Sequence, residues 1–190
     1  MSSRPSRPTS VAAPPPVVSK PPCKIDPTAI ISDKAVLVGT HPIIIGSRTV
    51  LHPYAKLDST NGPITLGSNC IISERANVEA QNDVKVDDHV SIETGALVRS
   101  SRIGQCCTIS AYAILQTGTQ LGQFCKITPK CTLLSGTVLP DFTVVLDKGR
   151  QRIDTTTSSR RDIQDLKIKG QAMHVDTLKR LIPSSMAKWA

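Results

Sequence analysis

The sequence predicts an all-β protein, a parallel β-helix of hexapeptide repeats with about six to seven triangular coils, followed by a C-terminal α-helical segment. An aliphatic residue recurs every six positions, with short interruptions, at 20 places between Ile25 and Val145. A small residue such as Ala, Thr or Cys usually stands four positions after each of them. Aromatic residues form only 3% of the 190 residues, so the core must consist of Ile, Leu and Val.

A six-residue unit combines a short strand with a turn, and three units close one triangular coil. Within a unit, the aliphatic residue and the small residue four positions later point inward, because side chains alternate along an extended chain. Successive coils then stack about 4.8 Å apart through parallel strand pairing. An α-helix would need a period near 3.6 residues, which the series lacks. The inward aliphatic positions are Ile25, Ile31, Leu37, Ile45, Leu51, Leu57, Leu66, Ile72, Val78, Val86, Ile92, Val98, Ile103, Ile109, Leu115, Leu121, Ile127, Leu133, Leu139 and Val145.

The segments outside this series predict a tail at each end of a β-helix domain that covers residues 25–150. Residues 1–22 contain seven of the 14 prolines, so we expect a disordered tail over residues 1–24. Residues 151–190 predict a linker and a helical segment, in which Ser159 is the N-cap and Gly170 interrupts the helix. A second helical stretch, with Met173, Leu178, Leu181 and Ile182 at helical spacing, should end before Pro183 and pack along the coils.

The net charge of +8 comes from the two ends of the chain. Residues 1–24 hold four basic and no acidic residues, residues 147–190 hold ten basic and five acidic residues, and the part between them holds nine and ten. The predicted β-helix is therefore neutral and shows no basic stripe interleaved with aromatic residues, which argues against nucleic-acid binding. No apolar run approaches the roughly 20 residues of a membrane span, and Pro14–Pro16 break the early apolar stretch. We expect a soluble cytosolic protein without membrane insertion.

Neither histidines nor cysteines form a recognisable catalytic or metal-binding pattern. His41, His52 and His89 fall on three different faces of the predicted coils, and His174 falls in the helical tail. Four of the six cysteines occupy the small inward position, where Cys serves as a small apolar residue. No C-x-x-C pair, phosphate-binding loop or nucleophile elbow is present. The sequence predicts no catalytic residue, cofactor-binding residue or metal ligand, and hence no cofactor.

The repeat as a whole resembles left-handed parallel β-helix proteins, a family of acyltransferases, nucleotidyl-sugar enzymes and zinc carbonic anhydrases. Within it, the stretches IGSRTVLHP at 45–53, GPITLG at 62–67, LPDFTVV at 139–145 and LKRLIP at 178–183 resemble the hexapeptide-repeat subunits of the dynactin pointed-end complex. These stretches include Arg48, His52, Pro53, Gly62 and Pro63. The resemblance covers about residues 25–183.

The resemblance implies a non-catalytic subunit of the cytoplasm and cytoskeleton. Its implied partners are a sibling β-helix subunit and, through it, the actin-related protein at the pointed end, in a complex that links dynein to cargo. Two alternatives remain open. One is a trimeric hexapeptide-repeat enzyme that binds an acyl-CoA or a metal between subunits, for which His52→Ala is the informative variant. The other is a scaffold in a different assembly.

Overall fold

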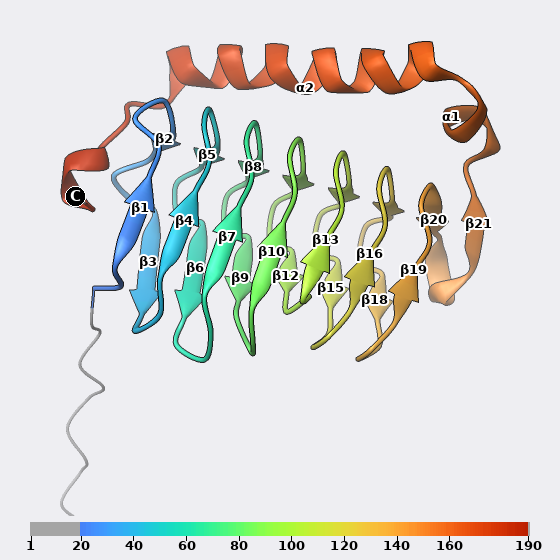
Figure 1. Cartoon of the computed structure of the whole chain (residues 1–190), viewed down its shortest axis with the longest axis horizontal. Coiled ribbons are helices and arrows are strands. Elements are labelled where there is room, and N and C mark those ends of the chain that lie inside the picture. The colour runs from blue at the N-terminus through green and yellow to red at the C-terminus, as the bar shows by residue number, and fades with distance from the viewer. Residues whose placement is uncertain (1–19, 190) are drawn as a thin grey trace, which may run out of the picture.

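The computed structural model describes residues 20–189, and most of the predicted disordered tail lies outside them. The described chain forms a left-handed parallel β-helix, as the sequence predicts (Figure 1). Six complete coils of three strands are followed by a partial coil, and each strand pairs in parallel with the equivalent strand of the next coil. The register joins inward positions, for example Ile45 with Leu66 and Val86 with Ile103.

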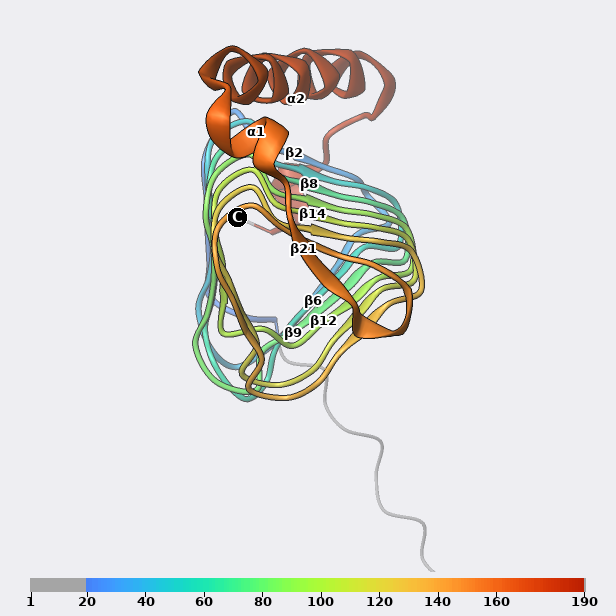
Figure 2. The ribbon, with the colours of Figure 1, turned by 90° about the vertical axis from the view of Figure 1, so that its right-hand side faces the viewer.

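The strands form three sheets, called here face 1, face 2 and face 3, which are the three sides of the prism (Figure 2). Face 1 contains β1 (Cys23–Ile25), β4 (Ile43–Ile45), β7 (Ile64–Leu66), β10 (Val84–Val86), β13 (Arg102–Ile103), β16 (Gln120–Leu121) and β19 (Val138–Leu139). Face 2 contains β2 (Ile30–Ile31), β5 (Val50–Leu51), β8 (Ile71–Ile72), β11 (Ser91–Ile92), β14 (Thr108–Ile109), β17 (Lys126–Ile127), β20 (Thr143–Val145) and the antiparallel β21 (Gln151–Ile153). Face 3 contains β3 (Val36–Gly39), β6 (Lys56–Ser59), β9 (Asn77–Glu79), β12 (Leu97–Val98), β15 (Ile114–Leu115) and β18 (Thr132–Leu133).

The core lies inside this prism and consists of stacked aliphatic side chains. All 20 aliphatic positions except Ile25 of the first coil are buried. The small positions are also buried at Ala55, Cys107 and Ala113, where the chain turns a corner and leaves no room for a larger side chain. The β-helix starts at Cys23, two residues before the boundary predicted from the first aliphatic residue, because Cys23 and Lys24 pair with Ile43 and Ile44.

The C-terminal segment differs from the prediction in two respects. The short helix α1 (Thr155–Ser159) starts at the N-cap Asp154, so Ser159 ends this helix and does not cap the next one. The long helix α2 (Arg161–Leu181) runs through Gly170 without a break, because its packing on face 2 outweighs the low helix propensity of one glycine. It ends before Pro183, as predicted.

Helix α2 returns along the outside of the coils toward the first coil (Figures 1 and 2). Residues 20–189 also form two short 3-10 helices, η1 (Asp147–Gly149) before β21 and η2 (Met186–Lys188) after α2. Within residues 20–189, none of the helices is long and apolar enough to cross a bilayer.

Candidate functional site

The histidines lie at separate corners of the prism. His41 follows β3, His52 follows β5 and His89 lies between β10 and β11. Burial lowers the pKa of His52, the nearby Glu74 opposes this effect, and His174 of α2 adds to it. Within residues 20–189, no three His, Cys, Asp or Glu side chains are grouped as a metal site would need.

The family-like residues of the sequence occupy structural positions. The guanidinium of Arg48 donates to Asn69 Oδ1 at 2.9 Å, to Asp176 Oδ1 at 2.8 Å and to the Ala172 carbonyl at 3.3 Å, so it attaches α2 to the coils. A Cβ on Gly62 would lie 2.4 Å from the carbonyl oxygen of Asn82, which explains the glycine.

The other three family-like residues are part of the backbone scaffold. His52 and Pro53 lead from β5 into the next corner, where the His52 amide donates to the Ile72 carbonyl at 2.9 Å. The Pro63 carbonyl accepts from Val84 at 3.0 Å. None of these residues meets another to form a reactive pair.

The inward cysteines are core residues. Cys107 and Cys125 stack on adjacent coils, and burial raises the pKa of the Cys107 thiol well above its ordinary value. Burial also raises the pKa of Cys70 to about 12. All six cysteines have free thiols, and the raised pKa values of Cys70 and Cys107 deprive these two of the thiolate character that nucleophilic or metal-binding cysteines need. The hydrogen bond with Cys107 lowers the pKa of Cys125.

The C-terminal half of α2 makes a dry contact with face 2. Val175 and Leu178 pack with the outward side chains of the first three coils, Ile30, Val50 and Ile71. All five are buried, so this contact excludes water and fixes the helix.

The N-terminal half of α2 covers a polar part of face 2, and a cleft of about 260 Å³ remains beneath it. Outward positions that are Ile or Val in the first coils are Thr108 and Lys126 here, so the helix and the sheet have no apolar side chains to interlock. The cleft is lined by His89, Cys106, Thr108, Phe124, Cys125, Lys126, Lys167, Gly170 and Gln171. Sequence reasoning missed this grouping, although His89, Cys106 and Phe124 each stand three positions after an inward aliphatic residue and therefore share one corner.

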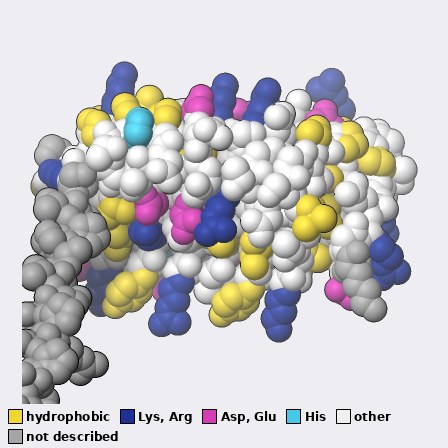
Figure 3. Space-filling model, turned by 90° about the horizontal axis from the view of Figure 1, so that it is seen from below, with side chains coloured by type: hydrophobic (Ala, Val, Ile, Leu, Met, Phe, Trp, Pro, Cys, Tyr) yellow, Lys and Arg dark blue, Asp and Glu magenta, His cyan; other side chains and the backbone are white. Residues whose placement is uncertain are grey.

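Another corner, between face 2 and face 3, carries an alternating column that the sequence analysis also missed. Lys34, Tyr54, Arg75, Tyr112 and Lys130 project there, all of them exposed. The Lys34 ammonium lies 5.7 Å from the Tyr54 ring centroid. Basic and aromatic residues do alternate on this edge, contrary to the expectation, but Asp33 and Glu74 stand beside them in the chain and offset their charge. The view from below shows charged and hydrophobic side chains interspersed (Figure 3).

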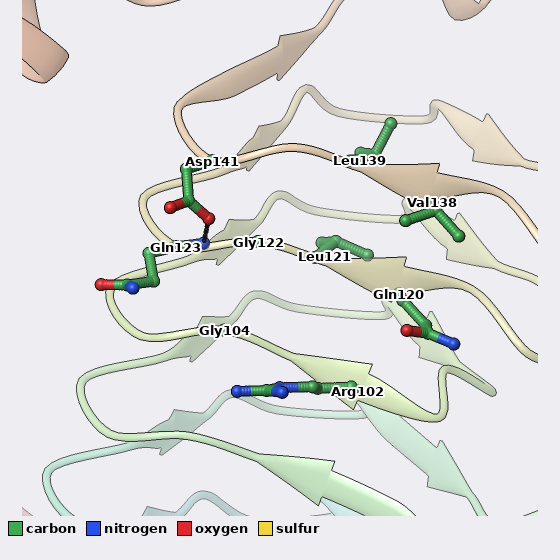
Figure 4. A pocket seen from close by; sticks show the side chains of 9 residues that line it. All are labelled: Arg102, Gly104, Gln120, Leu121, Gly122, Gln123, Val138, Leu139 and Asp141. Atoms are coloured by element: carbon green, nitrogen blue, oxygen red, sulfur yellow. Dashed lines mark hydrogen bonds between the residues drawn. The ribbon is translucent and has the colours of Figure 1, made fainter.

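Face 1 has a shallow hollow of about 260 Å³ over the last coils (Figure 4). Arg102, Gln120 and Val138 form its row of outward side chains. The carboxylate of Asp141 at its rim accepts from the Gln123 amide at 2.7 Å, so its hydrogen bonding serves the turn. The hollow contains no acid and base pair suited to proton transfer.

The first coil is closed by the chain's own C-terminus. Met186 and Trp189 pack against the core at this end, and the Ser185 amide donates to the Ile31 carbonyl at 2.8 Å. The Lys188 ammonium donates to the Asp33 carbonyl at 2.9 Å. Trp189 and Lys20 both line an apolar cavity of about 330 Å³ beside β3.

The last coil is more open. Strand β21 covers only β20, whereas β18 and β19 have a paired neighbour on one side alone within residues 20–189. Leu134, Val138 and Ile153 are 72%, 66% and 48% exposed around these strands. Unpaired strand edges with exposed apolar side chains are typical of surfaces that pair with another chain.

Comparison with known proteins gives one sequence relative and several structural ones. No family model matches the chain. Dynactin subunit 6 of Nematostella vectensis is 33% identical over 70 residues, which cover 37% of this chain and 37% of that protein. The chain thus matches little more than a third of the length of that curated relative.

The structural relatives share the fold. A putative acetyltransferase of Bacillus cereus superposes with a TM-score of 0.58 at 15% identity, over 84% of this chain and 92% of that chain. A hexapeptide transferase family protein of Anaplasma phagocytophilum gives a TM-score of 0.53 at 14% identity, over 80% and 90% of the two chains. The chain is therefore a hexapeptide-repeat β-helix that is similar in part of its sequence to dynactin subunit 6.

Proposed function

We propose that this chain is a non-catalytic structural subunit of a dynactin-type pointed-end complex, which supports dynein-driven cargo transport along microtubules. The observation that carries the proposal is the 33% identity to dynactin subunit 6 over 70 residues. The proposed location is the cytoplasm, on the cytoskeleton. The proposed partners are a sibling hexapeptide-repeat subunit and, through it, the actin-related protein at the pointed end.

The open last coil supports an assembly role. A partner that is itself a parallel β-helix would continue the edges of β18 and β19, because both chains repeat with the same spacing of about 4.8 Å. The first coil is less suited, since Met186 and Trp189 occupy the position of a further coil. Leu134 and Val138 would then be buried at the contact.

The test is the native mass of the tagged full-length chain in a gentle cell extract, with its co-purifying chains identified. We expect a large particle that contains an actin-related protein and a second hexapeptide-repeat protein. A compact homotrimer without partners would overturn the proposal and favour an enzyme with intersubunit sites.

A double variant tests whether the last coil is the surface that contacts the partner. Leu134→Asp with Val138→Lys should abolish co-purification of the second hexapeptide-repeat protein, whereas the thermal midpoint should stay unchanged because both side chains are exposed. Met173→Asp on α2 is the matched control, since Met173 is 71% exposed and stands in the C-terminal half of α2, which packs on the first three coils. Equal loss of the partner in both variants would contradict the role of the last coil.

A further inference from the structure

The cleft beneath the N-terminal half of α2 contains polar groups that the fold leaves without partners. The Nδ1 atom of His89 is buried and makes no hydrogen bond among the described residues. The Lys126 ammonium makes no ion pair or hydrogen bond within residues 20–189. A buried polar atom without a partner costs free energy of folding, so His89 Nδ1 indicates an occupant that supplies the bond, and the exposed Lys126 side chain at the same cleft has its charge available to a ligand.

The charge around the cleft is positive. Lys126 and Lys167 both line it, and no Asp or Glu does. The Lys167 ammonium donates to Thr157 Oγ1 at 3.1 Å and lies 3.9 Å from Asp154 Oδ2, so it is anchored to α1, and its charge is only partly compensated. The carboxylate of Asp88, which follows β10, accepts from the Ser68 amide at 2.7 Å.

Gly170 supports the same interpretation. A glycine inside a helix reduces stability relative to alanine, and an added Cβ at Gly170 would meet no atom within 4 Å. Close packing therefore does not require this glycine. Because Gly170 lines the cleft, its missing side chain keeps that space open.

The volume of the cleft and the side chains that line it limit which ligands it can bind. About 260 Å³ is below the roughly 300–1,000 Å³ of pockets for drug-sized ligands, so the occupant is compact. A water molecule could satisfy His89 but would supply no counter-charge to Lys126 and none beyond the long 3.9 Å contact with Asp154 to Lys167. Burial raises the pKa of Cys106 to about 11, although Lys167 opposes this effect, so the thiol at this site is neutral.

We propose that this cleft binds a compact oxyanion of phosphate size, held between Lys126 and Lys167 with His89 Nδ1 as a hydrogen-bonding group. Ammonium groups bind phosphate as point charges, and charge-assisted hydrogen bonds are the stronger kind. This site lies on the helical side of the prism and is separate from the last coil proposed for assembly, so either proposal can fail without the other.

The test is an NMR titration of the full-length isolated chain with inorganic phosphate at constant ionic strength. The chain has four histidines, so each ring gives a distinct probe. We expect the His89 ring signals to move and saturate with phosphate, while His41 and His52 at the other corners stay in place. Sodium chloride and acetate serve as comparison anions. Shifts of all four rings that grow linearly would overturn the proposal, and so would a response to acetate with none to phosphate.

Variants of residues that line the cleft, compared with a control variant on α2, test whether phosphate binds in the cleft. Lys126→Gln and Gly170→Leu should each weaken phosphate binding at least about fivefold, the first by removing a charge and the second by filling space. Lys169→Gln is the control, because Lys169 is an exposed lysine of α2 that does not line the cleft. Thermal unfolding of each variant checks that it is folded. Equal affinity of the Lys126→Gln and Lys169→Gln variants would overturn the site.

Discussion

Asp154 is the residue that caps the start of α1. Its Oδ1 accepts from the Thr157 amide at 3.0 Å and its Oδ2 accepts from Thr157 Oγ1 at 2.6 Å, and these bonds lower the pKa of the carboxyl. Asp154→Ala should lower the free energy of unfolding by about 1 kcal/mol, because N-cap bonds are lost. The Asp154→Asn variant should retain most of the free energy of unfolding that Asp154→Ala loses. Urea denaturation measures both, and an equal loss in the two variants would exclude capping as the cause.

His52 gives the fold a pH dependence. Burial holds the pKa of His52 below its ordinary value of 6.5, so the unfolded chain takes up this proton at higher pH than the folded chain does. The corresponding stability is fully present above about pH 6.5 and is lost as the pH falls below it. We expect His52→Gln to flatten the decline of the unfolding free energy between about pH 7 and pH 5. An equal decline in the wild-type and His52→Gln proteins would contradict the prediction.

At the scale of elements, the attachment of α2 depends on its apolar half. Leu178 is 8% exposed and packs among the outward residues of the first coils, so Leu178→Ala should cost about 2–4 kcal/mol. Asp176→Asn should cost less than about 1 kcal/mol, because the Arg48 and Asp176 side chains are 40% and 55% exposed. Hydrogen exchange of the α2 amides and thermal unfolding measure the difference. A larger effect of Asp176→Asn would mean that the ion pair dominates.

The strands were predictable from the sequence because each one is specified by a repeat of six neighbouring residues. Inward positions such as Leu51 and Ile109 repeat in register with the turns, so the period alone determines which side chains are buried. The path of α2 was not predictable in the same way. It depends on contacts such as Arg48 with Asp176, which are 128 residues apart and follow no period.

The cleft beneath the N-terminal half of α2 was likewise only partly predictable from the sequence. The repeat places His89, Cys106 and Phe124 at one corner, since each is the third residue after an inward aliphatic residue. The sequence does not reveal that Lys167 and Gly170 lie opposite them, because the predicted interruption at Gly170 would have divided the helix. The low helix propensity of glycine predicts an interruption at Gly170 that is wrong, because the packing of Val175 and Leu178 stabilises the helix by more than one glycine destabilises it.

At the scale of the whole molecule, α2 and the coil stack have matching lengths. A helix of 21 residues is about 31 Å long, and six steps between coils amount to about 29 Å. The helix therefore spans the rod from the last coils to the first. This match lets one continuous helix carry the C-terminus back to the position where it closes the first coil.

Removal of that closure should have a global effect. A chain truncated after Pro183 lacks Met186 and Trp189, so the core of the first coil and the edge of β2 become accessible. We expect a lower thermal midpoint and concentration-dependent self-association, because open strand edges pair with other chains. Light scattering after size-exclusion chromatography measures the association. A truncated chain that remains a monomer with an unchanged midpoint would show that the closure is dispensable.

Because α2 returns along the coils, the first and last described residues lie at the same end of the rod. Lys20 and Trp189, the first and last described residues, line one cavity at the first coil. A tether or a fluorophore attached at either of these two residues therefore lies at the same pole of the molecule. A rod immobilised through Lys20 or Trp189 presents its last coil outward.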